Sequence, residues 1–524
     1  MRYLLFALVF FALLPVASAS GSGVTVIVDF GNGVVLQGQV QWHENISAFE
    51  ATYAFVNETG LEFSYSVSEY GVMVNSIGGF GASWPGPWWH LFTLENGSWE
   101  ASPVSCDQLV LEEGDTVAWA FYQDPEGWPN ISQPSILPPW GPTWFSAPTP
   151  GEGEAPDLSA PAWSVHVADW GVQTTAAVVE GRVVVNSWEG ALVLDPETGE
   201  VLARVQGTYG LSQPTGYGQY FLLGTGNGVA LYRLDGTKVW ETDTLGVLAG
   251  GALPYYGVFY FGTANLSGGP AALYAVWANG TVMWSVELDE SSYFSAPAAM
   301  GDLIVFPLAG VYDPGNFSFS NGGVLLVNRS TGEVVASFSG FSVSCVPLVE
   351  DNAIYVTSRE GFLHKLVYEN GSLEEEWRVM IRFSTSSPIS TNYGILVGWG
   401  SFQTGKGGLV LVTRDGMVRW RAGLGAVQSK PLLLSNNTVI ASTNTPTGRV
   451  YVLAFTEDDY EVMQQVDLGN YVLSSPSYSN GWVFLGCDDG NLYAFAPGPS
   501  VPEFGTVSLM AVVMVLAVLR WRRR

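Results

Sequence analysis

The chain is short of basic residues. Lys and Arg together number 20 against 48 Asp and Glu, so the formal net charge is −28. A field of this sign repels polyanions such as nucleic acids and anionic lipid surfaces. We therefore expect no nucleic-acid partner.

Cysteine and histidine are also scarce. The three cysteines (Cys106, Cys345 and Cys487) are too few for a disulfide framework, and we expect them to be buried apolar residues. The four histidines show no zinc-binding spacing. Because these residue types identify neither a catalytic residue nor a metal ligand, we favour a protein that is not an enzyme.

The rest of the composition is that of a folded protein. Hydrophobic residues make up 47% of the chain and aromatic residues 13%, which excludes a disordered chain. A length of 524 residues leaves room for two or more domains with their own cores.

Residues 1–19 have the pattern of a signal peptide. Arg2 precedes an apolar run from Leu4 to Val16, and Ala17-Ser18-Ala19 supplies the small residues found before a cleavage site. We predict cleavage after Ala19 and export of the remaining chain.

Residues 499–524 are predicted to be a sorting signal or membrane anchor. Pro502-Glu503-Phe504 precedes an apolar run from Val507 to Leu519, and an arginine-rich end follows. This order resembles the PEF-CTERM sorting signals of archaeal surface proteins, which implies cleavage near the Pro-Glu-Phe motif and transfer to a lipid. A plain membrane anchor is the alternative. Both predict a cell-surface protein with its body outside the membrane.

Ten Asn-x-Ser/Thr sequons accompany the export signal, and each is a candidate for glycosylation. They begin at Asn45, Asn57, Asn96, Asn130, Asn265, Asn279, Asn316, Asn328, Asn370 and Asn436.

Residues 20–123 are predicted to form a small α+β or mostly-β domain. Val24–Phe30 and Val72–Ile77 have the alternation of strands, and Leu109–Leu111 and Thr116–Ala120 flank a turn as two further strands. Ser47–Phe55 has the pattern of a helix capped by Ser47.

The order of the segments VTVIVDFGNG, SAFEA, YGVMVNSIGG, WWHLF and EEGDTVAW resembles the transcobalamin C-terminal-like family of small exported domains. The resemblance implies the fold of that family, whose full-length namesakes use this domain to cover a corrinoid. The chain departs from the family pattern because Asn96-Gly97 does not directly follow Trp88-Trp89. Cobalamin capture is therefore kept only as an alternative function.

Trp84, Trp88, Trp89 and His90 are the candidate ligand contacts of this domain. Indoles on a loop stiffened by Pro and Gly can stack on a sugar ring or a flat cofactor. In the alternative that we favour, Trp88 or Trp89 lies in the core and Trp84 packs over the loop.

Residues 124–159 are predicted to be a stiff linker rich in Pro and Trp, because proline fixes φ and removes backbone donors. Its tryptophans indicate that part of it packs on a neighbouring domain, and residues 151–157 are the expected hinge.

Residues 160–498 consist of repeats of a four-stranded unit. A proline recurs in the first predicted strand of each repeat at spacings of 40, 43, 50, 41, 43 and 45 residues, the period of a propeller blade. The prolines are Pro214, Pro254, Pro297, Pro347, Pro388, Pro431 and Pro476. Polar turns lead into a fourth strand that carries Trp240, Trp284, Trp377 or Trp420.

The last repeat has only three strands, and Ala162–His166 can supply the fourth from the front of the domain. This pairing would close the ring and remove an open sheet edge. We therefore predict a mainly β fold with an eight-bladed propeller; a seven-bladed ring is the alternative.

Two turns, at Asp195–Ala203 and Asn328–Ala336, carry the pattern Asp/Asn-x-x-Thr-Gly-Glu-x-x-Ala. They resemble the docking motif of the quinoprotein (PQQ-like) propeller family, with Glu for Lys and Ala for Trp. The resemblance implies a propeller in which the motif's indole packs between blades. The redox members add a vicinal Cys pair that is absent from this sequence, so the resemblance implies the non-enzymatic branch, which includes a propeller lipoprotein that scaffolds outer-membrane assembly.

We expect no cofactor, whether PQQ, calcium or cobalamin. Asp488-Asp489-Gly490 could hold calcium, but this sequence between two strands is ordinary hairpin chemistry.

The sequence therefore predicts an exported, surface-anchored binding or scaffolding protein. Its propeller face and its small domain would bind a cell-surface protein or polysaccharide. The alternatives are a quinone-dependent or polysaccharide-acting propeller enzyme, and corrinoid capture by the first domain.

Overall fold

The computed structural model describes residues 23–30, 35–59, 61–68, 71–82, 88–95, 98–122, 155–255, 257–435 and 437–498. Two compact units divide between residues 142 and 143. The predicted signal peptide with Ala19, the sorting signal with Pro502, Glu503 and Phe504, most of the linker, and Trp84 lie outside the described residues. In these ranges, no helix combines the length and the apolar character needed to cross a membrane.

The first unit contains a five-stranded sheet in the order β2-β1-β8-β6-β7 and a three-stranded sheet in the order β3-β4-β5. Strands β1 and β8 are parallel, and the other neighbouring pairs are antiparallel. The elements are β1 (Gly23–Asp29), β2 (Val35–Gln41), α1 (Ala48–Thr59), β3 (Phe63–Ser68), β4 (Gly71–Ile77), β5 (Phe80–Gly81), β6 (Trp88–Glu95), β7 (Ser98–Ala101) and β8 (Thr116–Tyr122).

Helix α1 begins at the predicted cap. Ser47 Oγ accepts a hydrogen bond from the Glu50 backbone N at 3.1 Å, and Glu50 Oε2 accepts one from the Ser47 backbone N at 2.9 Å. This reciprocal pair is a capping box. Trp119 Nε1 of β8 donates to Thr52 Oγ1 at 2.8 Å, which ties the helix to the sheet.

One predicted strand of the first unit is wrong. Leu109–Leu111 forms no strand, because its backbone bonds to the segment that starts the helix instead of to a sheet. The Ala48 N donates to Leu109 O at 2.8 Å, and the Leu111 N donates to Ile46 O at 2.9 Å.

The described part of the second unit forms eight four-stranded antiparallel sheets, which we number in chain order. Sheet 1 has β10 (Ala177–Val179), β11 (Arg182–Ser187), β12 (Gly190–Leu194) and β13 (Val201–Val205); sheet 2 has β14 (Thr215–Tyr217), β15 (Tyr220–Gly224), β16 (Gly228–Arg233) and β17 (Lys238–Asp243). Sheet 3 has β18 (Leu253–Tyr255), β19 (Val258–Gly262), β20 (Ala271–Trp277) and β21 (Val282–Leu288); sheet 4 has β22 (Ala298–Met300), β23 (Leu303–Asp313), β24 (Ser318–Asn328) and β25 (Val334–Ser339).

The remaining sheets follow the same plan. Sheet 5 has β26 (Leu348–Glu350), β27 (Ala353–Thr357), β28 (Phe362–Glu369) and β29 (Ser372–Met380); sheet 6 has β30 (Ile389–Thr391), β31 (Gly394–Ser401), β32 (Lys406–Val412) and β33 (Val418–Gly423). Sheet 7 has β34 (Leu432–Ser435), β35 (Thr438–Ser442), β36 (Arg449–Phe455) and β37 (Tyr460–Asp467); sheet 8 has β38 (Ser477–Ser479), β39 (Trp482–Gly486), β40 (Asn491–Phe495) and β9 (Trp163–His166).

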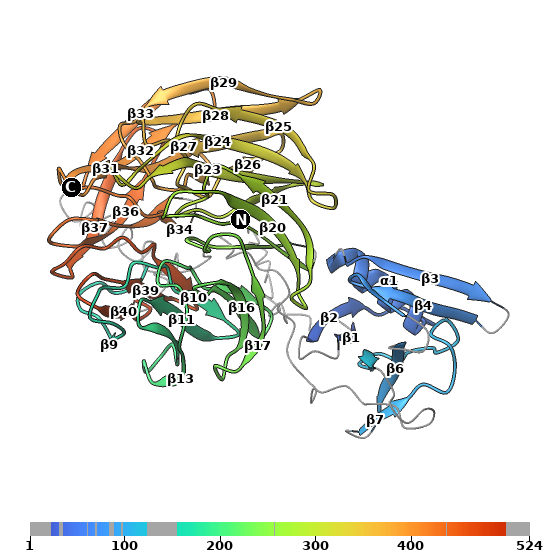
Figure 1. Cartoon of the computed structure of the whole chain (residues 1–524). Helices are drawn as coiled ribbons and strands as arrows, with labels where there is room; N and C mark the ends of the chain where they lie inside the picture. Colours follow the sequence, from blue (N-terminus) through green and yellow to red (C-terminus); the bar gives the residue numbers. More distant parts are fainter. Residues whose placement is uncertain are drawn as a thin grey trace, which may run out of the picture. The chain divides into compact units, whose positions relative to one another are not determined.

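Sheet 8 joins the two ends of the unit, as the sequence predicts. Strand β9 pairs with β40, with Ser164 opposite Tyr493. Strand β10 contacts both β14 and β38, and in Figure 1 β39 and β40 lie beside β9, β10 and β11. The sheets therefore pack in a closed sequence, the eighth against the first.

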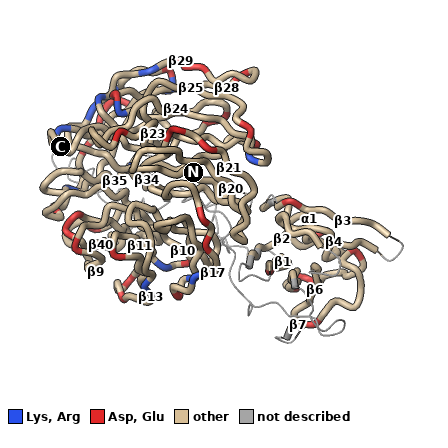
Figure 2. Tube along the Cα trace, viewed as in Figure 1, with Lys and Arg blue, Asp and Glu red and all other residues tan. Residues whose placement is uncertain are grey.

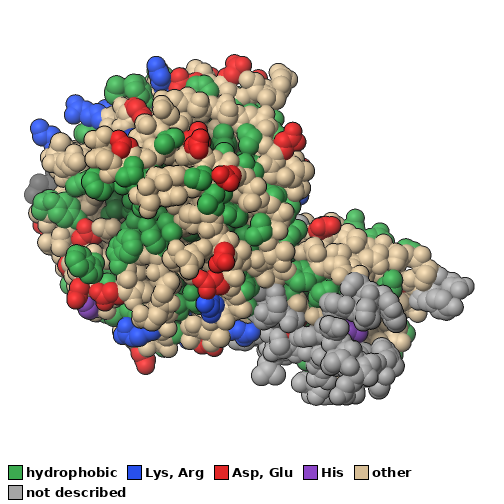
Figure 3. Space-filling view, in the orientation of Figure 1, with side chains coloured by type: hydrophobic (Ala, Val, Ile, Leu, Met, Phe, Trp, Pro, Cys, Tyr) green, Lys and Arg blue, Asp and Glu red, His purple; other side chains and the backbone are tan. Residues whose placement is uncertain are grey.

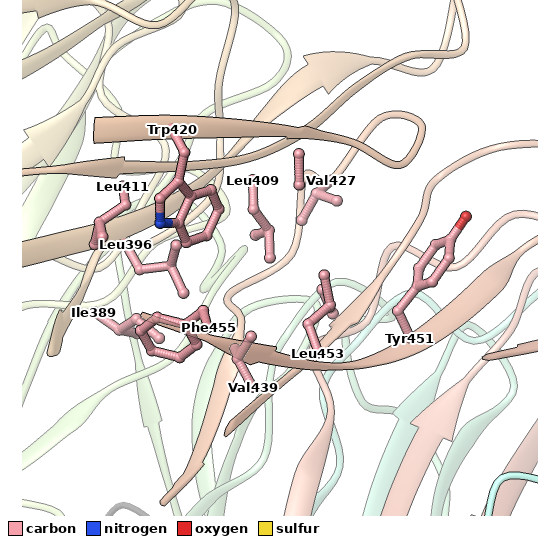
Figure 4. Close-up of a cluster of buried hydrophobic side chains, with 12 residues drawn as sticks. Ile389, Leu396, Leu409, Leu411, Trp420, Val427, Val439, Tyr451, Leu453 and Phe455 are labelled. Carbon is pink, nitrogen blue, oxygen red and sulfur yellow. The ribbon is translucent and has the colours of Figure 1, made fainter. Parts of the chain in front are cut away.

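Apolar clusters fill the spaces between successive sheets. The cluster between sheets 6 and 7 includes Leu396, Leu411, Trp420, Leu453 and Phe455 (Figure 4). Strands such as β15 are buried along their whole length, because both faces of the sheet meet a neighbouring sheet.

Tryptophans on five of the eight fourth strands join their sheet to the next, as the resemblance implies. Each indole Nε1 donates to a backbone carbonyl in a turn of the following sheet. The bonds run from Trp163 to Pro196, Trp240 to Ala278, Trp284 to Arg329, Trp377 to Arg414 and Trp420 to Thr456, at 2.8–3.1 Å. The turn glycine lies under the ring at several of these contacts, including Gly280 under Trp240 and Gly332 under Trp284.

The end of the predicted linker is part of the second unit. Pro156 bridges to Pro497, and Leu158 is buried among side chains of sheets 7 and 8. The Leu158 N also donates to Gln464 Oε1 at 2.9 Å. Residues 155–158 are thus fixed by packing rather than forming part of a hinge.

Charge is unevenly distributed along the chain. No Lys or Arg occurs between Arg2 and Arg182, and Figure 2 accordingly shows basic positions only on the second unit. Acidic positions occur on both units (Figure 2).

Candidate functional site

Every sheet of the second unit has one end with the longer connections. Adjacent strands are antiparallel, so the hairpins between the second and third strands lie at the same end as the segments that lead to the next sheet. We call this end the loop face.

Exposed aromatic side chains gather on the loop face. Within the described part of the second unit, four aromatic side chains are exposed, and all four lie there: Trp170 (79%), Trp188 (49%), Phe317 (82%) and Phe402 (50%). In the space-filling view, hydrophobic side chains of the second unit form separate patches with few Lys or Arg among them (Figure 3). The restriction of exposed aromatic side chains to one face is typical of a binding surface.

Trp170 and Trp188 line a shallow depression of about 350 Å³. Trp170 lies between β9 and β10, and Trp188 lies in the turn between β11 and β12. The Asp169 backbone N donates to Glu189 Oε1 at 2.8 Å. Because each of these residues is the chain neighbour of one indole, the bond joins the two loops that carry the indoles.

A second aromatic group lies around Arg359. Tyr293 packs on Phe319 with ring centroids 4.9 Å apart, and Phe319 packs on Tyr312 at 5.0 Å. The Arg359 guanidinium lies 5.4 Å from the Phe319 ring and 6.0 Å from the Tyr293 ring, which is cation–π distance. Burial lowers the pKa of Arg359 and raises that of Tyr293 to about 12.

A long hairpin brings Tyr312 and Phe319 to this group. Strands β23 and β24 each have 11 residues and pair out to Asp313 and Ser318. The sequence signal for this extension is the spacing of 50 residues between Pro297 and Pro347, the longest of the repeat.

Ser358, His364 and Glu375 have the connectivity of a catalytic triad. His364 Nε2 lies 3.1 Å from Ser358 Oγ, and His364 Nδ1 lies 2.6 Å from Glu375 Oε1. Burial lowers the pKa of His364, although the Glu375 hydrogen bond opposes the shift. Ser358 is fully buried, however, and Thr225 and Thr443 use the equivalent hydroxyl to bond their own hairpins. The arrangement therefore stabilises a hairpin.

The aromatic candidates of the first unit lie on strand β6. Trp89 is buried, donates from Nε1 to Phe80 O at 2.8 Å and packs edge-on against Phe30. The favoured prediction of a core indole is therefore confirmed for Trp89. Trp88 and His90 are half-buried, and Trp84 lies outside the described residues.

The sequons differ in exposure. The side chains of Asn45, Asn57, Asn316 and Asn370 are exposed, whereas those of Asn265, Asn279 and Asn328 are half-buried. In the half-buried ones the amide Oδ1 accepts a backbone N–H from two residues ahead. Asn96, Asn130 and Asn436 lie outside the described residues. Glycosylation stays a prediction at all ten positions.

The three cysteines are buried and unpaired, as expected. Burial raises the pKa of Cys106 and Cys345 to about 11 and that of Cys487 to about 12, so none is a reactive thiol at neutral pH.

The turn before β40 is a hairpin, as the favoured interpretation predicts. Asp489 accepts hydrogen bonds from the Asn491 N and the Tyr493 hydroxyl. Asp488 Oδ1 is buried and has no hydrogen-bond partner among the described residues.

Comparisons with known proteins agree with this fold. Residues 155–372 match the family model described as outer membrane protein assembly factor BamB. Among solved structures, the chain is similar to a europium-containing methanol dehydrogenase (11% identity, TM-score 0.51, 65% of this chain and 94% of that chain). It is also similar to the computationally designed protein Ika8 (12%, 0.50, 64% and 99%) and to BamB from Moraxella catarrhalis (14%, 0.48, 64% and 97%).

No protein of curated function matches the chain in sequence. The structural likeness shows the β-propeller fold, and the family match over residues 155–372 supports a propeller of the PQQ-like kind. At these identities the solved structures show the fold alone.

Proposed function

We propose that this PQQ-like β-propeller chain is an exported, surface-anchored scaffolding protein, and that its eight sheets are the blades of one ring whose loop face docks a partner. The observation that carries the proposal is the position of the exposed aromatic side chains. Trp170, Trp188, Phe317 and Phe402 all project from loop-face segments, and aromatic anchors are the residues that dominate binding energy at interfaces.

The cellular location of the protein is inferred from its two terminal segments. Residues 1–19 supply export, and residues 499–524 supply attachment to the membrane or to a lipid. The family model that matches residues 155–372 is named for an assembly factor of outer-membrane proteins, which supports a protein partner in the cell envelope. A surface polysaccharide is the other partner class.

The test compares two variants of the exported chain that remove equal numbers of exposed apolar side chains. The first replaces the four loop-face aromatic residues by serine. The matched control replaces Leu202, Val282, Val334 and Met463, which are exposed on fourth strands. Binding of each variant to immobilised native envelope is measured by biolayer interferometry, before and after protease or glycosidase treatment.

We expect the loop-face variant to lose binding and the control to retain it. Loss after protease treatment would identify a protein partner, and loss after glycosidase treatment a polysaccharide. Equal binding by both variants would contradict docking through the loop face.

A further inference from the structure

We infer that the depression between Trp170 and Trp188 binds a cationic side chain, Lys or Arg, of a partner protein. The inference rests on the proposed function and narrows the partner to a protein that docks through a basic residue. Three features carry it: an indole ring that is held in place beside a second indole on a fixed loop, acidic residues next to both indoles, and, among the described residues, no Lys or Arg that forms an ion pair with these acids.

The ring of Trp188 is held in place from behind. A Cβ placed at Gly210 would lie 2.3 Å from the indole Cδ2, so one side of the ring packs directly on the Gly210 backbone. Tyr209 meets the same indole edge-on, with centroids 5.2 Å apart. About half of Trp188 nevertheless stays exposed. A fixed ring of this kind binds without a large loss of side-chain entropy.

The loop that carries Trp170 is fixed as well. The Asp169 backbone N is bonded to Glu189 Oε1 at 2.8 Å. On the other side, Gly171 packs on Asp488, since a Cβ at Gly171 would lie 3.0 Å from the Asp488 Cα and Oδ1. Trp170 therefore projects from a loop that is held on both sides.

The same contacts bring three acidic residues close to the loops of the two indoles: Asp169 and Glu189 are the chain neighbours of Trp170 and Trp188, and Asp488 packs on Gly171. In the described ranges, none of the three forms an ion pair with Lys or Arg, and the base that pairs with them is His166, 3.0 Å from Asp169. The chain has no Lys or Arg between residues 2 and 182. Burial raises the pKa of Asp488, as expected for a carboxylate without a cationic partner.

This combination favours a cation over a neutral ligand. A cation over the face of an indole is attracted by the ring quadrupole, and the attraction increases when carboxylates of opposite charge lie close by. A neutral sugar could stack on the same rings but would gain no charge–charge attraction. An anionic sugar or lipid headgroup would be repelled by the three carboxylates.

The full chain already contains such contacts, which shows that the geometry is accessible to this fold. Arg359 lies over Phe319 and Tyr293, and Arg382 lies 5.4 Å from the Trp399 ring. The depression differs because its own rings have no basic side chain over them in the described residues.

The experiment titrates the full chain and follows the indole N–H signals by transverse-relaxation-optimised NMR. The signals of the two indoles are assigned by their loss in Trp170→Phe and Trp188→Phe. The probes are Nα-acetyl-lysine methylamide, its uncharged analogue Nα-acetyl-norleucine methylamide, and the neutral oligosaccharide maltotetraose. We expect the lysine probe to shift both signals with an affinity at least about tenfold above that of the norleucine probe, with the preference shrinking in 1 M salt.

Charge variants supply the matched controls. Glu189→Gln keeps an acceptor for the Asp169 N but removes the charge, and Asp488→Asn removes a second charge. Each is expected to weaken binding of the lysine probe several-fold and to leave the norleucine probe unchanged. Asp458→Asn makes the same change of one charge at the opposite end of the sheets and should alter neither probe.

Equal affinity for the lysine and norleucine probes would overturn the inference, and so would a preference for maltotetraose. If the loop-face variant described above loses envelope binding while the lysine probe shows no preference, the cationic ligand is wrong and docking through the loop face stands. If the loop-face variant keeps its envelope binding and the lysine probe shows no preference, both the cationic ligand and the proposed function are wrong.

Discussion

Replacing Trp284 by alanine tests whether the fourth-strand indoles hold neighbouring sheets together. Trp284 projects from β21 and is 8% exposed. Its Nε1 donates to Arg329 O in sheet 4 at 2.8 Å. Its ring packs on Tyr260 and Phe306, with centroids 5.9 and 6.2 Å away, and covers Gly332. One side chain therefore joins two sheets through buried apolar contacts and a hydrogen bond.

The expected cost follows from these contacts. Truncating a buried Trp to Ala removes its packing and leaves a cavity, which costs about 3–5 kcal/mol. The lost hydrogen bond accounts for about 1 kcal/mol of stability. Trp284→Phe keeps much of the ring and loses the donor, so we expect about 1–2 kcal/mol for phenylalanine and about 3–5 kcal/mol for alanine.

Urea unfolding followed by circular dichroism and fluorescence gives the measurement, read from the transition of the second unit. The control is Trp170→Ala, because an indole that is 79% exposed should change the free energy of unfolding by no more than about 0.5 kcal/mol. A loss below about 1 kcal/mol for Trp284→Ala, with a folded protein and an unchanged slope, would refute the role of the indole in joining sheets.

Three further predictions concern single groups. The pKa of His364 lies below its ordinary value of 6.5, so the unfolded state binds a proton more readily than the folded state. The contribution of His364 to stability should therefore be complete above pH 6.5 and fall as the pH drops toward the folded pKa. In His364→Phe, the urea midpoint should no longer show this dependence on pH. Ser47→Ala removes the cap from α1 and should cost the first unit about 1 kcal/mol in its own urea transition, whereas Ser47→Asp should cost less. The buried cysteines should react with a thiol reagent only after denaturant is added, and rapid labelling of native protein would contradict their raised pKa values.

Much of the second unit could be predicted because its signals are local. Turn residues such as Asn480-Gly481 separate short apolar runs, and the structure has a positive φ at both residues. The proline period located the sheets, although six of the seven prolines lie just before the first strand rather than in it. A residue without a backbone N–H suits that position, because it gives up no ladder bond.

The loop face was harder to predict, because its contacts join residues far apart in the repeat pattern. Trp170 lies in the segment that leads from sheet 8 to sheet 1, Trp188 lies in a hairpin of sheet 1, and no spacing rule relates them. Tyr293 comes from the segment between β21 and β22, Phe319 from β24, and Arg359 from the turn between β27 and β28. High aromatic density in the sequence pointed instead to Trp84, Trp88, Trp89 and His90; of these, Trp89 is buried in the core and Trp84 lies outside the described residues.

The depression also depends on how β9 completes sheet 8. Strand β9 is the last strand of sheet 8 but the first of the unit in the chain, and Trp170 lies in the segment that leads from β9 to β10. Trp163 of β9 donates to Pro196 O in sheet 1 at 3.0 Å and covers Gly199, so the strand that closes the last sheet also fixes that segment against the first. The segment that carries Trp170 is thus tied to sheet 1 by the bonds of Trp163 and Asp169 and to sheet 8 by the pairing of β9 with β40. We expect local opening of sheet 8 to loosen this segment, which couples the candidate binding site to the stability of the closing strand.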